Sequence, residues 1–181
     1  NSTASCAGVA LACGGGAGGS TSCAATGPAK AQPLHNTLVN NALLRWGSDE
    51  QKSRYLPRMT TDLLGAFALS EPASGSDAFA LECKAVQDGE DWLLTGRKFW
   101  ITSGAEAGLF IVFANVAPEK GYKGITAFLV EREMAGFSIG KREKKLGIRA
   151  SSTVELILES VRVPAANVLG PVGQGYKISI E

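Results

Sequence analysis

The first regular pattern in the chain is a helical one, at residues 34–46. Apolar side chains recur there every three or four positions and would cover one face of a helix. They are Leu34, Leu38, Val39, Ala42, Leu43 and Trp46. Gly47 is predicted to end this helix, and Ser48 is placed to cap a second one. The second helix has acidic residues in its first turn, where they are favoured, and is predicted to run toward Pro57.

From residue 63 onward the pattern changes to that of β-strands. Short runs rich in β-branched and aromatic residues are separated by clusters of Gly, Pro, Asn and Lys. The predicted strands are residues 63–69, 79–86, 92–97, 109–116, 125–130, 137–140, 154–163 and 168–169. Asp88 and Gly89 mark a hairpin turn between the second and third of these runs. Because helices do not alternate with the strands, a doubly wound α/β sheet is disfavoured, and an antiparallel barrel or sandwich is expected.

These patterns divide the chain into four parts and predict an α+β fold. Residues 1–33 are rich in Ala, Gly, Ser and Cys, contain no aromatic residue, and are predicted to be a low-complexity, poorly ordered segment. Residues 34–60 form short helices, and residues 61–169 form a β-domain. Residues 170–181, which contain three closely spaced glycines, are expected to be a linker.

Composition and charge narrow the possible partners. Eighteen Lys and Arg residues stand against seventeen Asp and Glu residues without a long block of like charge, which argues against nucleic acid. The most apolar stretch, residues 109–117, is too short to span a bilayer. The four cysteines show no CxxC spacing, and His35, the single histidine, is interpreted as structural or solvated, so no metal site is expected.

The stretch FALSEPASGSD, residues 67–77, changes from an apolar run to a polar loop. Pro72 fixes its own backbone and pushes the residue before it toward an extended conformation, so a strand should end here. Gly75 lets the backbone approach a ligand closely. Hydroxyl groups that could bond such a ligand are those of Ser70, Ser74 and Ser76.

The stretch KFWITSG, residues 98–104, consists mostly of β-forming residues and carries a large, flat indole at Trp100. A hydroxyl-rich loop beside such a strand suits a planar, phosphate-bearing cofactor. Taken singly, the spacing favours a core aromatic residue at Trp100, and at Thr102 a residue that only favours the strand.

Together, LSEPASGSD and KFWITSG at this separation resemble the acyl-CoA dehydrogenases, most closely the short/branched-chain and short-chain members. The resemblance covers residues 34–177. It implies FAD-dependent α,β-dehydrogenation of short or branched acyl-CoA thioesters, with hydride passing to FAD and electrons to an electron-transferring flavoprotein. It also implies a homotetramer in the mitochondrial matrix, or in the cytoplasm of a bacterium. Residues 34–60 would then end the N-terminal helical domain, and residues 61–169 would be the flavin-binding middle domain.

The resemblance also implies a set of site residues. Those expected to bind the cofactor are Phe67, Ala68, Leu69, Ser70, Glu71, Pro72, Ala73, Ser74, Gly75, Ser76, Trp100, Ile101 and Thr102. Ser70 would face the polar edge of the flavin ring, Trp100 would pack beside the ring, and Thr102 would approach its redox nitrogen. Ser76, near the cofactor pyrophosphate, and Tyr122 are expected to contact the substrate. A loop tyrosine without a partner is the alternative for Tyr122.

No acidic residue is assigned as the catalytic base. Members of the family are about twice as long as this chain, and their base comes from a C-terminal helical bundle, so the chain is interpreted as a fragment without its base. Glu181 matches no motif, and no carboxylate, Glu71 included, has a distinctive partner.

In KLGIRASST, residues 145–153, a polar cluster is expected mainly to fix a loop. Its members are Arg149, Ser151 and Ser152.

Two other functions stay open on the residues alone. One is an acyl-CoA oxidase-like flavoenzyme on the same scaffold, which would differ in its reaction with oxygen. The other is a non-catalytic, truncated β-domain that binds CoA esters or a partner protein without turnover.

Overall fold

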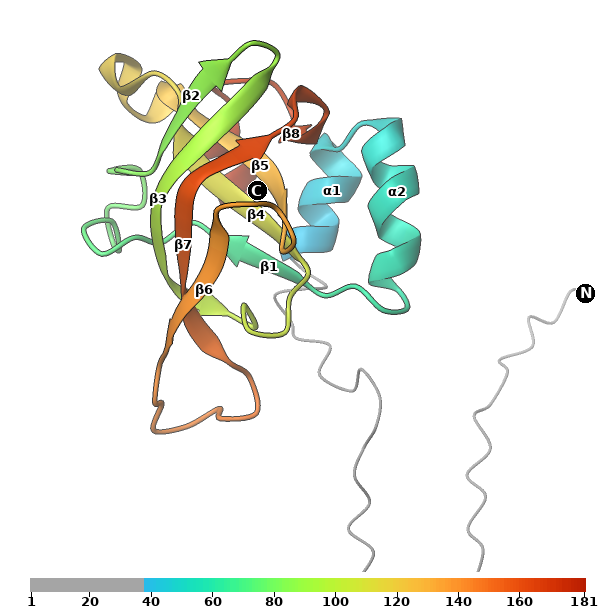
Figure 1. Ribbon diagram of the computed structural model, residues 1–181, viewed down its shortest axis with the longest axis vertical. Helices are drawn as coiled ribbons and strands as arrows, with labels where there is room; N and C mark the ends of the chain where they lie inside the picture. The colour runs from blue at the N-terminus through green and yellow to red at the C-terminus, as the bar shows by residue number, and fades with distance from the viewer. Residues whose placement is uncertain (1–37) are drawn as a thin grey trace, which may run out of the picture.

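The computed structural model describes residues 38–181. The predicted low-complexity segment, residues 1–33, lies outside the described residues, as do Leu34 and His35. Within residues 38–181, three short α-helices pack on one side of a curved eight-stranded sheet (Figure 1).

The first two helices follow the predicted pattern. α1 spans Asn40–Trp46 and α2 spans Asp49–Met59. Ser48 caps α2 as predicted: its Oγ accepts a hydrogen bond from Gln51 N at 3.2 Å, and the Gln51 side chain accepts one from Ser48 N at 3.1 Å. The helix continues two residues beyond Pro57 rather than ending there, because a proline in a last turn removes only one hydrogen bond. A third helix, α3, spans Gly175–Ile180 within the predicted linker.

The sheet is open and mostly antiparallel. Its strands are β1 Gly65–Ala68, β2 Lys84–Asp88, β3 Asp91–Thr102, β4 Leu109–Asn115, β5 Ile125–Glu131, β6 Phe137–Arg142, β7 Thr153–Val163 and β8 Val168–Leu169. They lie in the order β6-β7-β3-β2-β4-β5-β8, with β1 beside β4. Only the pairings of β4 with β1 and with β2 are parallel. The predicted α+β class is confirmed, with a curved sheet whose two ends, β6 and β8, do not pair.

The predicted hairpin forms between β2 and β3, and its turn residue Gly89 has a φ of +66°. The strand before it is shorter than predicted and begins only at Lys84. The preceding N–H groups, of Glu82 and Cys83, bond to the side-chain carboxylate of Glu71 instead of to a strand. A side chain distant in sequence therefore sets the start of β2.

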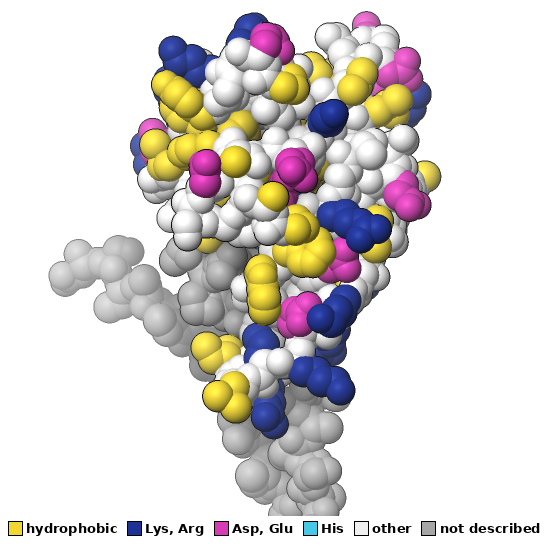
Figure 2. Space-filling view, turned by 90° about the vertical axis from the view of Figure 1, so that its left-hand side faces the viewer, with side chains coloured by type: hydrophobic (Ala, Val, Ile, Leu, Met, Phe, Trp, Pro, Cys, Tyr) yellow, Lys and Arg dark blue, Asp and Glu magenta, His cyan; other side chains and the backbone are white. Residues whose placement is uncertain are grey.

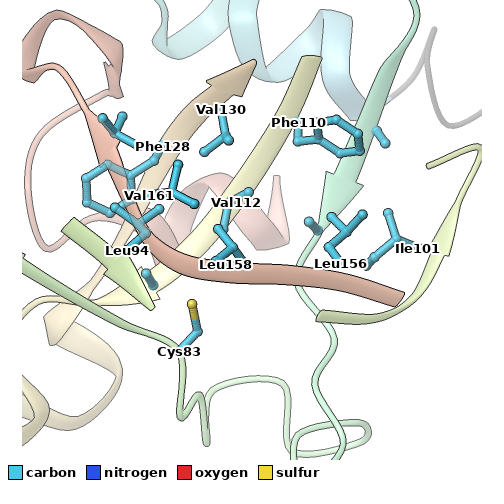
Figure 3. Packing of buried hydrophobic residues seen from close by; sticks show 14 of the residues in the cluster. Cys83, Leu94, Ile101, Phe110, Val112, Phe128, Val130, Leu156, Leu158 and Val161 are labelled. Carbon is cyan, nitrogen blue, oxygen red and sulfur yellow. The ribbon is translucent and has the colours of Figure 1, made fainter. Parts of the chain in front are cut away.

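One hydrophobic core lies inside the curve of the sheet (Figure 3). Phe110 and Val112 of β4 face Leu156 and Leu158 of β7 across this core. β4 is buried on both faces along its whole length, which explains why its sequence is a continuous apolar run rather than an alternating one.

A second hydrophobic core fills the space between the sheet and the helices. The other face of β4, with Leu109 and Phe113, packs there with Leu43 of α1 and Tyr55 of α2. The Tyr55 hydroxyl donates a hydrogen bond to the Glu131 carboxylate at the end of β5, at 2.7 Å. The helices and the sheet therefore form one packed unit, and this unit holds β1 and the loop that follows it.

Cys83 is a buried free thiol at the edge of the first core, directly before β2 (Figure 3). Burial raises the pKa of this thiol to about 11, because the thiolate would lose its hydration. The folded protein therefore holds this proton more tightly than the unfolded chain, whose thiol titrates near its ordinary value of 9.0. The free energy of unfolding should consequently fall as the pH rises through this interval.

We predict that this effect disappears in Cys83→Ala. The free energy of unfolding of the wild type, relative to that of Cys83→Ala, should decrease by about 2 kcal/mol between about pH 8 and about pH 10.5. Guanidinium denaturation of both proteins at the two pH values measures this difference. A difference that does not change with pH would contradict the prediction.

Candidate functional site

The two polar motifs lie side by side in the structure. Residues 70–77, which follow β1 and which we call the serine loop, run along β3. Phe99 of β3 donates its backbone N–H to the Ser70 carbonyl at 2.9 Å. The neighbouring Lys98 ammonium donates to the Leu69 carbonyl at 3.1 Å and to the Glu71 carboxylate at 2.6 Å. The chain is thus fixed to β3 at three consecutive residues, close to Trp100.

The serine loop also has hydrogen bonds of its own. Glu71 and Ser74 exchange backbone hydrogen bonds at 3.0 and 3.2 Å, and Ser74 Oγ donates to the Asp77 carbonyl at 2.7 Å. Ser74 is therefore buried and serves to hold the loop. Ser76 is exposed, and beyond the adjacent residues no atom lies within 4 Å of the place where a Cβ on Gly75 would stand. The tip of the loop is open to a ligand.

Trp100 projects from a bulge in β3. Lys98 pairs with Leu156 of β7, but the next paired residue on β3 is Ile101, opposite Val154, so one extra residue interrupts the ladder. Trp100 has a φ of +59°, a left-handed conformation that is costly for a bulky residue. Its side chain is 63% exposed. The bulge directs the indole out of the sheet, where a ligand can reach it.

The end of β3 is fastened to the KLGIRASST segment. Thr102 pairs with Thr153 in the sheet, and Ser103 donates its N–H to the Ser152 carbonyl at 2.8 Å. The hydroxyls of Ser103 and Ser151 lie 3.4 Å apart, and both serines of the segment are buried. The predicted loop-fixing role is confirmed for these two serines. Thr102, next to this junction, is half-buried and held in the sheet by its pairing with Thr153.

The tip of the hairpin between β6 and β7 is basic. Arg149, expected beside the serines, is exposed and donates instead to the Lys145 carbonyl at 3.1 Å. The pocket here, of about 390 Å³, is lined by four cationic side chains, those of Arg142, Lys144, Lys145 and Arg149, and among residues 38–181 the one carboxylate that lines it is that of Glu143. Figure 2 shows lysine and arginine side chains gathered at this narrow end of the molecule, near hydrophobic ones. Positive charge thus accumulates close to the end of β3, because the Lys145 ammonium donates to the carbonyl of Ser151, in the segment to which the end of β3 is fastened.

Tyr122, in the loop between β4 and β5, packs against two aromatic rings. Its ring lies 5.0 Å from that of Tyr176 of α3 and 6.3 Å from that of Phe79, which follows the serine loop. The side chain is still 47% exposed. Tyr122 is therefore not a loop tyrosine without partners, because it joins the segment after the serine loop to α3.

A comparison with protein families identifies this arrangement. A family model described as "Acyl-CoA dehydrogenase, middle domain" matches residues 66–161, more than half of the chain, from β1 into β7. This chain belongs to the acyl-CoA dehydrogenase family. A second model, "Acyl-CoA dehydrogenase, N-terminal domain", matches residues 14–62, which include α1 and α2. The predicted resemblance is confirmed.

Individual acyl-CoA dehydrogenases show the same likeness. The chain is 50% identical to the mitochondrial short/branched chain specific acyl-CoA dehydrogenase of Rattus norvegicus, over 81% of this chain and 34% of that protein. It is 54% identical to a probable enzyme of this name from Dictyostelium discoideum, over 82% and 36%. Among solved structures, butyryl-CoA dehydrogenase from Megasphaera elsdenii matches with a TM-score of 0.77 and 41% identity, over 78% and 38%. The chain spans about a third of the length of these acyl-CoA dehydrogenases.

The predicted cofactor residues differ in what they can present to a ligand. The exposed ones are Pro72, Ala73, Gly75, Ser76 and Trp100, and the half-buried ones are Phe67, Leu69, Ser70 and Thr102. Four others have buried side chains: Ala68, Glu71, Ser74 and Ile101. The side chains of Ala68 and Ile101 lie in the first core, so these two residues can meet a ligand only through their backbone.

The expectation that Glu71 has no distinctive partner is wrong, and Lys98, its partner, is not among the predicted site residues of this family member. The two side chains meet only because the serine loop docks on β3, which local sequence does not show. Strand alternation offered a signal: Leu94, Gly96 and Lys98 share one face of β3, and Leu94 is fully buried. A lysine on an inward face requires a buried acceptor or a carboxylate.

Glu181 does not stand free either. Its carboxylate accepts a hydrogen bond from Trp46 Nε1 at 3.2 Å and pairs with Arg45 at 3.2 Å.

Among residues 38–181, no group of three or more His, Cys, Asp and Glu side chains is placed to hold a metal ion. No helix in the same residues has both the length and the apolar character needed to cross a membrane.

Proposed function

We propose that this chain is the flavin-binding middle part of an acyl-CoA dehydrogenase that oxidises short or branched acyl-CoA thioesters. One observation carries the proposal: the serine loop lies beside the strand from which the exposed Trp100 projects. Family membership supports the reaction, and the names of the relatives support the substrate class. In this proposal residues 34–60 end a helical domain, residues 61–169 bind the flavin, residues 170–181 lead toward further helices, and residues 1–33 form a separate segment.

The residues present suit FAD. The exposed indole of Trp100 offers a flat apolar surface on which an aromatic ring system can pack. The open position at Gly75 and the exposed hydroxyl of Ser76 leave room and a donor for the phosphates at the tip of the serine loop. When bound, FAD supplies the acceptor for the hydride that leaves the β-carbon of the substrate.

Ser70 and Thr102 are the proposed hydrogen-bond donors to the flavin ring. A donor at the polar edge of the ring stabilises the negative charge that it gains on reduction. Both residues are held before any ligand binds, Ser70 through its carbonyl to Phe99 N and Thr102 through its pairing with Thr153. The backbone positions from which the two hydroxyls project are therefore fixed in the protein without ligand.

Ser76 and Tyr122 are the proposed substrate contacts. Ser76 is exposed at the end of the serine loop, and Tyr122 keeps about half of its surface accessible while its ring is held by Phe79 and Tyr176. Ser76 precedes Phe79 by three residues, and the ring of Phe79 contacts that of Tyr122. We assign them to the CoA ester rather than to the flavin ring.

We place the base that removes the α-proton outside these 181 residues. Glu71 is engaged by Lys98, and Glu181 is engaged by Trp46 and Arg45. The proposed electron acceptor is an electron-transferring flavoprotein, and the proposed assembly is a homotetramer. The proposed location is the mitochondrial matrix, or the cytoplasm in a bacterium; the name of the rat relative, which includes the word mitochondrial, supports the mitochondrion.

The test is an absorbance spectrum of the full-length protein that carries this chain. We expect flavin bands that bleach when butyryl-CoA or 2-methylbutyryl-CoA is added without oxygen, and the ester that bleaches them more completely indicates the preferred chain. Rapid return of the bands in air without a protein acceptor would favour an oxidase. A colourless protein that does not take up added FAD would contradict the proposal and favour a binding domain without turnover.

A further inference from the structure

Lys98 and Glu71 form an ion pair that is closed off from solvent. Lys98 Nζ lies 2.6 Å from Glu71 Oε1, and the two side chains are 0% and 2% exposed. Every other ion pair found among residues 38–181 has at least one side chain that is half exposed or more. Burial of either charge without the other would be strongly unfavourable, so each residue requires its partner.

The pair joins three segments of the chain. Lys98 belongs to β3 and Glu71 to the serine loop. The Glu71 carboxylate also accepts the backbone N–H groups of Glu82 at 2.6 Å and Cys83 at 3.2 Å, directly before β2. Lys98 Nζ donates in addition to the Leu69 carbonyl at 3.1 Å. The loop cannot shift along β3 without breaking several buried hydrogen bonds, which makes its position specific.

This junction lies between the residues proposed to bind flavin. Ser70 is flanked by the two residues that Lys98 binds, and Trp100 lies two residues beyond Lys98 at the bulge. The remaining hydrogen bond found between the serine loop and β3 runs from Phe99 N to the Ser70 carbonyl. The placement of the Ser70 hydroxyl relative to the indole therefore depends on the ion pair.

The stability of the fold does not by itself require a charged pair at the positions of Lys98 and Glu71. A buried ion pair can often be replaced by apolar side chains of similar volume without loss of stability. Apolar side chains cannot, however, hold the Leu69 carbonyl or the N–H groups that precede β2. We propose that Lys98 and Glu71 are positioning residues that hold the serine loop in register with Trp100, so that a bound flavin has one orientation. This inference rests on the proposed function.

The test compares the wild type with the double variant Lys98→Met/Glu71→Leu, in the full-length protein purified with its flavin. Because the double variant leaves no charge unpaired, we expect it to fold, with a thermal midpoint lowered by the loss of the hydrogen bonds to the Leu69 carbonyl and to the N–H groups of Glu82 and Cys83. We expect shifted flavin absorption bands and a kcat lower by about 100-fold, since a small misplacement of reacting groups has about this effect. KM for the acyl-CoA should change by less than about threefold. Wild-type bands and kcat in the double variant would overturn the proposal.

Arg97→Met is the matched control. It removes the neighbouring cation of β3, which is 65% exposed and lies 3.5 Å from Glu155, and should leave the bands and kcat unchanged. If the double variant does not fold, Lys98→Met/Glu71→Gln gives the same readout, because it leaves no charge unpaired and keeps an acceptor oxygen for the N–H groups that precede β2, while the link from Lys98 to the serine loop is still lost. Shifted bands in that variant support the proposal, and unchanged bands overturn it. A wild-type protein without flavin would overturn the proposed function itself, before any variant is compared.

Discussion

Trp100→Ala is expected to weaken FAD binding about 10- to 100-fold while leaving the fold intact. Stacking of an aromatic side chain on a flat heterocycle contributes roughly 1–3 kcal/mol, and about 1.4 kcal/mol corresponds to a tenfold change in affinity. Because the indole is 63% exposed, its removal takes little packing from the core. The free energy of unfolding should change by less than about 0.5 kcal/mol. Flavin fluorescence titration of the full-length protein and thermal denaturation measure the two quantities.

Two further variants show whether the loss comes from the indole itself. Trp100→Phe keeps an aromatic plane and should fall between the wild type and Trp100→Ala. Leu146→Ala removes a side chain that is 97% exposed at the tip of the β6–β7 hairpin, and should bind FAD like the wild type. An Ala variant at position 100 with wild-type affinity would exclude Trp100 from the flavin site.

Phe128→Ala is expected to destabilise the protein by about 3–5 kcal/mol, which is a large part of the stability of an ordinary domain. Phe128 of β5 is fully buried, and its ring lies 5.8 Å from that of Trp92 of β3. Figure 3 shows it beside Leu94 and Val161, so its ring fills space between strands on opposite sides of the core. Paired strands cannot easily close the cavity that the truncation leaves. Chemical denaturation measures the change.

The comparison variants for this prediction are Phe128→Leu and Val86→Ala. Leucine refills much of the space, so Phe128→Leu should cost clearly less than Phe128→Ala. Val86 of β2 is 61% exposed, and its truncation should change stability by less than about 0.5 kcal/mol. A loss below about 1 kcal/mol in Phe128→Ala would show that the first core tolerates a void at this position.

Most helices and strands could be predicted because their signals are local. Ser48 and Gln51 form the cap of α2 within four consecutive residues, and Gly89 allows the turn of the β2–β3 hairpin. The apolar run of β4 is read directly as a strand buried on both faces. Such features depend on neighbours in sequence, so one sequence suffices.

The differences come from contacts between distant residues. The predicted strand at residues 79–86 loses its first part because Glu71 takes two of its N–H groups. The parallel pairing of β1 with β4 depends on how the intervening hairpin folds, which no local pattern specifies. An open sheet cannot be told from a closed barrel by strand signals alone, because both have the same alternation.

The candidate site likewise has features that could be predicted from the sequence and features that depend on contacts between distant residues. The neighbourhood of the serine loop and β3 followed from a resemblance, and the contacts of Phe99 with Ser70 bear it out. The left-handed backbone of Trp100 could not be foreseen, because it arises from a register shift against β7. For Lys98, strand alternation indicates an inward-facing side chain, but its partner Glu71 could not be foreseen, because the pair forms only when the whole loop is in place.

The pairing of β3 with β7 has a consequence for how the protein is made. Trp92 pairs with Val163 and Thr102 with Thr153, so one edge of β3 must wait for a partner that is synthesised much later. Contacts between such distant residues form slowly, and a growing chain presents its N-terminal part first. During translation, β3 can pair with β2 at once, but its other edge stays open until β7 has left the ribosome. We expect the cofactor to meet a sheet that is already assembled, rather than to guide its assembly.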